Sequence, residues 1–142
     1  MTFGQLCAVI GVGIITATFA VLHYLRDPLD SYIERKEEEV RGKMRDWASK
    51  VCGHGYITPE LSDEFWDIVS TYAEEIDTPK DLYTSMRDNM LLSGLLFIIA
   101  SFLSIMPEFE PYAYILVIAA LLFLASALYY FIKLDGVIKS SS

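Results

Sequence analysis

Few residues of this chain combine types and spacings that could do chemistry. Cys52 and His54 lie on either side of a glycine, and thiolate and imidazole are ligands that zinc prefers. A structural zinc site needs four ligands, and the remaining candidates, Cys7 and His23, belong to an apolar stretch near the N-terminus. The pattern therefore favours an ordinary helix-ending turn at residues 52–55. We predict no metal and no cofactor.

Two groups of acidic residues are the next candidates. Paired carboxylates can act as general acids and bases when they are buried close together, but on charged helix faces they are solvated. The second group also opens a predicted helix, where acidic side chains interact favourably with the helix dipole. We interpret both groups as solvated surface that could bind a basic partner. Their members are Glu37, Glu38 and Glu39 in the first group, and Glu60, Asp63, Glu64 and Asp67 in the second.

The usual catalytic motifs are missing from the sequence. It contains no glycine-rich phosphate loop, no HExxH pair and no Ser, His and Asp in a catalytic pattern. The glycines of Gly11-Val12-Gly13 lie inside an apolar stretch with no strand before them, so they do not form a nucleotide fingerprint. The sequence does not favour an enzyme, and its net charge of −8 does not favour a nucleic-acid binder.

The elements that position these residues are dominated by three uncharged stretches, 3–25, 90–106 and 112–132. About 20 apolar residues are enough for a helix to cross the hydrocarbon core of a bilayer. Inside lipid the backbone must satisfy its own hydrogen bonds, so each stretch is expected to be helical. We predict an all-α integral membrane protein with three transmembrane helices and a small helical cytoplasmic cap between spans one and two.

The basic residues predict the orientation of these spans. All eleven lie either in 26–89 or after residue 132, and cytoplasmic segments of membrane proteins are enriched in Lys and Arg. We therefore expect an N-terminal transmembrane helix with its N-terminus outside (1–25), an acidic helical cytoplasmic segment (26–89), a transmembrane hairpin (90–132) and a cytoplasmic tail (133–142). The expected location is the plasma membrane.

The segment 26–89 predicts three short helices. Asp27-Pro28 is expected to break the first helix where it leaves the membrane, because proline disfavours helix in the residue before it. A second helix over 29–51 would end at the glycines of 53–55, and Thr58 with Pro59 would start another. Pro79 follows the same kind of start signal, so a further helix is expected to run from there into span two.

Small residues four apart are the main packing signal in the spans. Such pairs allow two helices to approach closely. Packing within the chain and packing against another copy or another membrane subunit both remain open. The pairs are Gly4 and Ala8, Gly13 and Ala17, and Ala100 and Ser104.

The predicted topology resembles that of minimal membrane insertases, which also combine an N-out anchor, a helical cytoplasmic segment and a membrane hairpin. No motif extends the resemblance, because that family's segment resembles a basic coiled coil and its spans carry a hydrophilic groove, whereas this segment is acidic and these spans are uncharged.

The sequence favours a non-catalytic small membrane subunit or scaffold, acting in a homo-oligomer or as an accessory subunit of a larger membrane complex. One alternative is an oligomeric pore or membrane-perturbing effector gated by its cytoplasmic cap, and another is an insertase-like factor. The expected partners are membrane lipid, copies of the chain or other membrane subunits, and a basic cytoplasmic protein, but no nucleic acid.

Overall fold

The computed structural model describes residues 1–140, and three long helices make up nearly all of them. Helix α1 spans Phe3–His54, α2 spans Pro59–Ile105 and α3 spans Glu110–Ser140, with a short 3-10 turn, η1, at Pro107–Phe109. Each long helix contains an apolar window long enough to cross a membrane. The fold is therefore all-helical with three helices that can span a bilayer, as the sequence predicts.

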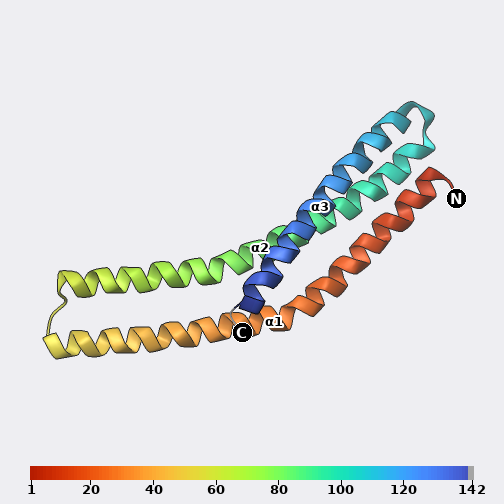
Figure 1. Cartoon of the computed structure of the whole chain (residues 1–142). Coiled ribbons are helices and arrows are strands. Elements are labelled where there is room, and N and C mark those ends of the chain that lie inside the picture. The colour runs from red at the N-terminus through yellow and green to blue at the C-terminus, as the bar shows by residue number, and fades with distance from the viewer. Residues whose placement is uncertain (141–142) are drawn as a thin grey trace.

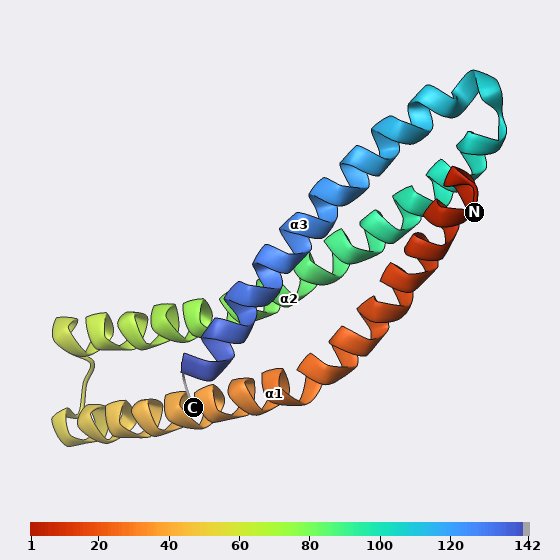
Figure 2. The ribbon, with the colours of Figure 1, turned by 45° about the vertical axis from the view of Figure 1, so that its right-hand side comes forward.

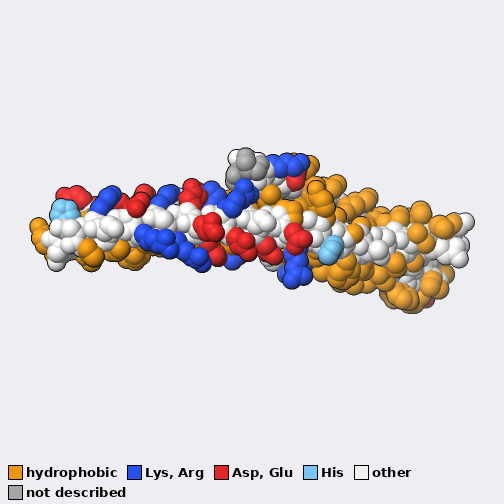
Figure 3. Space-filling model, turned by 90° about the horizontal axis from the view of Figure 1, so that it is seen from below, with side chains coloured by type: hydrophobic (Ala, Val, Ile, Leu, Met, Phe, Trp, Pro, Cys, Tyr) orange, Lys and Arg blue, Asp and Glu red, His pale blue; other side chains and the backbone are white. Residues whose placement is uncertain are grey.

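The molecule has two limbs that meet at an angle (Figures 1 and 2). We call residues 3–25, 90–106 and 112–132 the span limb, and residues 26–89 the hairpin limb. Helices α1 and α2 run antiparallel through both limbs, while α3 returns along the span limb. Apolar side chains cover the span limb and charged side chains cover the hairpin limb (Figure 3). The boundary between the limbs thus coincides with the boundary between apolar and charged sequence.

The last helix of the hairpin limb runs into span two as predicted, but the expected three-helix cap is wrong, because α1 and α2 also continue through the two predicted breaks. Pro28 lies inside α1 and Pro79 lies inside α2. An internal proline removes one helix hydrogen bond and bends the helix, but it need not end it. The turns on both sides of each proline are held by burial, of Leu25 and Leu29 in α1 and of Ile76 and Leu82 in α2. Tertiary packing here outweighs the local signal.

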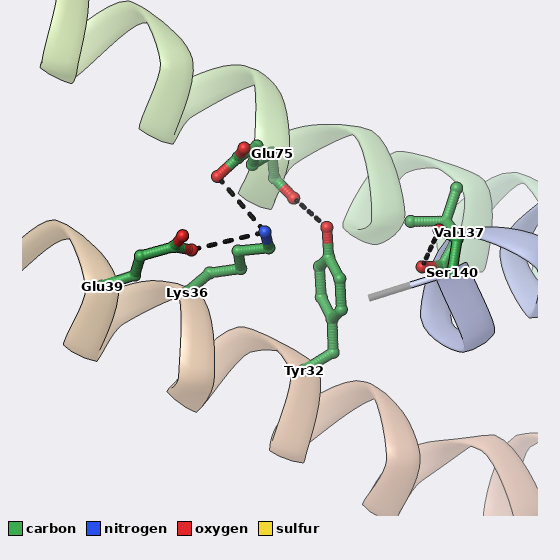
Figure 4. A network of polar contacts seen from close by, with 6 residues as sticks. All are labelled: Tyr32, Lys36, Glu39, Glu75, Val137 and Ser140. Carbon is green, nitrogen blue, oxygen red and sulfur yellow. Dashed lines mark hydrogen bonds and ion pairs between the residues drawn. The ribbon is translucent and has the colours of Figure 1, made fainter. Parts of the chain in front are cut away.

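A side chain of α1 replaces the hydrogen bond that Pro79 removes from α2. Since Pro79 has no N–H, the carbonyl of Glu75 loses its donor four residues on. The hydroxyl of Tyr32 donates to this carbonyl at 3.3 Å, and Tyr32 is only 4% exposed. The ammonium of Lys36 lies 3.7 Å from the carboxylate of Glu75 and 3.4 Å from that of Glu39 (Figure 4). The base of the hairpin limb is thus fixed around the irregular turn of α2.

The turn between α1 and α2 forms where the sequence predicts it. Gly55 ends α1 in the left-handed conformation, with φ of 78°, and its N–H donates to the carbonyl of Val51. Glycine adopts this conformation without the steric cost of a side chain. Thr58 then caps α2 by accepting a hydrogen bond from the backbone of Leu61 at 3.2 Å.

The expected tail, 133–142, divides into two parts. Residues 133–140 continue α3, and residues 141–142 lie outside the described part of the chain. Leu134 is fully buried with Leu25, Leu29 and Met86, so the end of α3 packs against the base of the hairpin limb. A second buried cluster, around Cys7, Phe97 and Ala113, holds the opposite end of the span limb. Both α1 and α3 pack extensively on α2 and make few contacts with each other.

Candidate functional site

Two of the three small-residue pairs pack within the chain. A Cβ on Gly4 would collide with the hydroxyl of Ser104, and Ala100 is fully buried. Ala8 is half-buried on the same side of α1. The third pair, Gly13 and Ala17, is exposed, and a Cβ on Gly13 would meet nothing within 4 Å. This pair alone faces outward from the span limb.

A close approach of α1 and α2 involves two glycines that the four-residue spacings do not reveal. A Cβ on Gly11 would lie 2.9 Å from the carbonyl oxygen of Gly94. A Cβ on Gly94 would lie 2.6 Å from Cγ1 of Ile15. One glycine comes from each helix, so the spacing within a single helix does not reveal the pair. Gly11 lies in the apolar stretch 3–25 and Gly94 in 90–106, but only the crossing of the two helices brings them together.

Polar side chains inside the span limb are paired with backbone. Ser93 is fully buried and donates to the carbonyl of Ala120 at 2.8 Å, which links α2 to α3. Thr18 is also fully buried and donates to the carbonyl of Ile14 in its own helix at 2.7 Å. Within residues 1–140, no buried side-chain nitrogen or oxygen lacks a hydrogen-bond partner. These polar groups therefore serve packing between and within the helices.

The structure keeps the candidate metal ligands apart. Cys7 is buried in the span limb, whereas Cys52 is exposed at the far end of the hairpin limb. His54 follows Cys52 in the last turn of α1, with its ring 6.5 Å from that of Tyr56. Across the described residues, no three His, Cys, Asp or Glu side chains gather closely enough to hold a metal ion.

The two helices of the hairpin limb are held in register near its far end. The indole N–H of Trp47 donates to the carbonyl of Leu61 at 2.7 Å, and its ring lies 5.1 Å from that of Phe65. The ammonium of Lys50 forms an ion pair with Glu64 at 2.8 Å. Glu64 is thus separated from the other candidate acids of its group, because it faces α1.

The acidic residues of α1 do not form a single face. Glu37, Glu38 and Glu39 follow one another along the helix, so they point in different directions. Glu39 accepts a hydrogen bond from Lys36, and Glu38 lies in a shallow cleft with Arg41 and Arg45. Residues 26–54 contain seven acidic and seven basic residues, so the α1 half of the hairpin limb has no net charge.

The acidic residues of α2 form one continuous exposed face. Residues 59–89 contain nine acidic and two basic residues, so the α2 half of the hairpin limb carries its negative charge. Seven of the nine are exposed and follow one another at intervals of three, four or seven residues, which places them on one side of a helix over about 40 Å. We call them the acidic stripe: Glu60, Asp63, Asp67, Glu74, Asp77, Asp81 and Asp88.

The acidic stripe lies opposite the face of α2 that packs on α1. With 3.6 residues per turn, the buried residues Leu61, Ile68 and Ile76 fall on the other side of the helix. At the far end of the hairpin limb the stripe borders exposed apolar side chains. Tyr56, Ile57 and Trp66 are 67%, 58% and 62% exposed. The hairpin limb therefore presents charge along one helix and apolar surface at its tip.

In comparisons with protein families, curated proteins and solved structures, nothing matches this chain.

Proposed function

We propose that the protein is a non-catalytic membrane subunit whose hairpin limb, residues 26–89, is a docking arm for another protein. The span limb holds the chain in the bilayer, and the hairpin limb presents its acidic stripe to a basic partner in a larger membrane complex. The positions of the basic residues favour a cytoplasmic location for this arm. The acidic stripe is the observation that carries the proposal.

The physical argument begins with what the acidic stripe does not do. Burial of Ile68 and the hydrogen bond of Trp47 hold the hairpin limb together on the opposite face of α2. Seven carboxylates on one helix face repel one another, which lowers the stability of the isolated arm. A partner with Lys and Arg at matching intervals would remove this repulsion. Electrostatic complementarity of this kind favours rapid and specific association.

The continuity of α1 and α2 supports the same function. A docking arm must hold its binding face at a defined position relative to the membrane. Both helices cross the limb boundary unbroken, and Tyr32 and Lys36 of α1 bind Glu75 of α2 close to that boundary. A partner bound along the stripe would therefore be held at a defined distance from the bilayer.

The proposal is tested by purification from the native membrane in mild detergent, followed by measurement of the mass and composition of the particle. We expect a second, basic chain at low salt and its loss at high salt, because salt screens exposed charges. The triple variant Asp63→Asn, Asp67→Asn, Glu74→Gln should no longer co-purify with the basic partner. The control Glu34→Gln, Glu38→Gln, Asp46→Asn removes the same charge from exposed positions of α1 and should retain it.

Self-association in the membrane is a second candidate, because Gly13 and Ala17 leave a flat exposed strip on α1. A particle containing several copies of this chain and nothing else would favour it over the docking arm. Dissociation of that particle by Gly13→Leu, with no effect of Gly53→Leu in the hairpin limb, would then locate the contact. A monomer with no second chain would contradict both candidates.

A further inference from the structure

The seam between α1 and α3 contains two hollows that neither helix packing nor the docking arm explains. The first has a volume of about 120 Å³, and all its lining side chains are apolar. Helix α3 contributes four of the six lining residues, and α1 and α2 contribute one each. The lining residues are Val21, Met90, Leu124, Ala127, Leu128 and Phe131.

The second hollow lies next to the first on both walls. It has a volume of about 280 Å³ and combines apolar with polar and charged side chains. On α1, Tyr24 follows Val21 by three residues, and on α3, Asp135 follows Phe131 by four, which is about one helical turn in each case. The two hollows therefore succeed one another along the same seam.

The depths of the two hollows in the bilayer match those of the acyl chains and the phosphate of a lipid. The first hollow is formed by the last uncharged turns of the spans, and the second begins where charged residues appear, at Arg26 in α1 and Lys133 in α3. In a bilayer, acyl chains occupy the hydrocarbon core and phosphates lie at its polar edge. The apolar hollow thus lies at acyl-chain depth and the polar hollow at phosphate depth.

The polar hollow has the donors that a phosphate needs. Among the described residues, two cations, Arg35 and Lys139, and one carboxylate, Asp135, line this hollow. The ammonium of Lys139 lies 3.0 Å from Asp135, and this hydrogen bond raises the pKa of Lys139. Guanidinium groups bind phosphate oxygens with paired hydrogen bonds. Both cations already have contacts, and a phosphate would share their several N–H donors.

Other groups of the polar hollow fit the rest of a headgroup. Ser31 contributes a hydroxyl to the lining. Pro28 has no N–H, so the carbonyl of Tyr24 lacks its helix donor and can accept a hydrogen bond from a hydroxyl. A glycerol headgroup carries hydroxyls of this kind.

We propose that this seam binds one anionic glycerophospholipid, with an acyl chain in the apolar hollow and its phosphate against Arg35 and Lys139. The lipid completes the contact between α1 and α3 that the protein's own side chains leave open. The proposal is independent of the docking arm, since none of the lining residues belongs to the acidic stripe.

The test is native mass spectrometry of the purified protein in detergent, titrated with phosphatidylglycerol or with phosphatidylcholine. We expect saturation at one phosphatidylglycerol per chain, bound more tightly than phosphatidylcholine. The variant Arg35→Gln, Lys139→Gln removes both cations and should weaken the binding of phosphatidylglycerol by at least about tenfold, the effect of losing one charge-assisted hydrogen bond. The control Arg26→Gln, Lys133→Gln removes two exposed cations at the same boundary that do not line the hollow, and it should bind as the wild type does.

A second variant tests the apolar hollow. Leu128 lies at its mouth and is 57% exposed, so Leu128→Trp can fill the opening without disturbing the buried core. It should weaken both lipids. Equal affinity for the two lipids in the wild type, equal loss in the two charge variants, or uptake of many lipids without saturation would each overturn the proposal. Far-UV circular dichroism of every variant establishes that the helices are intact.

Discussion

Replacing Gly11 with alanine tests the crossing of α1 and α2 directly. The added Cβ would lie 2.8 Å from Cγ1 of Ile98, 2.9 Å from the carbonyl oxygen of Gly94 and 3.1 Å from Cβ of Phe97. Carbon atoms in good contact are about 3.5–4.0 Å apart. The side chain of Ile98 can rotate away, but the Gly94 carbonyl belongs to the backbone of α2. The two helices must therefore separate by several tenths of an ångström.

The expected cost follows from the packing that this separation loosens. An inserted methyl group in a well-packed core costs about 1–3 kcal/mol. Alanine has a higher helix propensity than glycine by about 1 kcal/mol, which offsets part of the cost. The matched control, Gly13→Ala, has the same propensity gain two residues away and meets nothing within 4 Å. We therefore expect Gly11→Ala to be less stable than Gly13→Ala by about 1–3 kcal/mol.

The assay is reversible unfolding of the purified protein by sodium dodecyl sulfate in mixed micelles, followed by circular dichroism. Gly11→Ala should unfold at a lower fraction of dodecyl sulfate than the wild type, and Gly13→Ala at the same fraction or a higher one. Gly94→Ala should resemble Gly11→Ala, because its Cβ would meet Ile15 at 2.6 Å. Equal midpoints for Gly11→Ala and Gly13→Ala would refute the close crossing.

Three further predictions concern the hairpin limb. Tyr32→Phe leaves the Glu75 carbonyl without a donor and should cost about 1–3 kcal/mol, with faster amide exchange around residues 75–80; unchanged exchange would count against the bond. Trp47→Phe removes the hydrogen bond to Leu61 and should lower the free energy of unfolding by about 0.5–1.5 kcal/mol, whereas the exposed control Trp66→Phe should stay within about 0.5 kcal/mol of the wild type. Burial lowers the pKa of Lys36, but Glu75 and Glu39 together outweigh this effect and the pKa lies above its ordinary 10.5. The contribution of Lys36 to stability is therefore fully present below pH 10.5 and should be lost as the pH rises through the higher folded value; Lys36→Gln should abolish this part of the alkaline profile, and an unchanged profile would contradict it.

The sequence predicts the spans because their signal is additive. Each long helix contains an uncharged apolar stretch, and no single residue decides the outcome. The turn at residues 55–58 was equally predictable, since Gly55 and Thr58 act locally. A feature can thus be predicted from the sequence when it depends on neighbouring residues, as the turn does, or on the composition of one stretch, as the spans do.

The continuity of the hairpin limb could not be found in this way. Pro28 and Pro79 are helix-breaking signals locally, and the contacts that override them come from residues distant in sequence. The bond from Tyr32 to the carbonyl of Glu75 joins positions in two helices. The Gly11 and Gly94 contact has the same character. Each is a property of a pair whose register is set only when α1 and α2 pack.

The acidic groups lie between these two cases. The sequence groups Glu60, Asp63, Glu64 and Asp67 as one cluster, but in the structure Glu64 belongs to the face that binds α1. The seven-residue repeat that continues the stripe to Asp88 is present in the sequence, but the predicted break at Pro79 hid it. Once α2 is continuous, Glu74 and Asp81 fall on the same side of one helix.

The continuity of the long helices also links the docking arm to the proposed lipid site between α1 and α3. The base of the hairpin limb and the end of α3 share one buried cluster that includes Leu29, Met86 and Leu134. The polar hollow is built on the turns of α1 and α3 beside that cluster. A movement of the hairpin limb relative to α3 must therefore change the shape of the hollow, because closely packed helices do not deform independently. If a partner on the acidic stripe favours one position of the arm, it must change the affinity for the lipid. By thermodynamic linkage, the lipid then changes the affinity for the partner by the same factor.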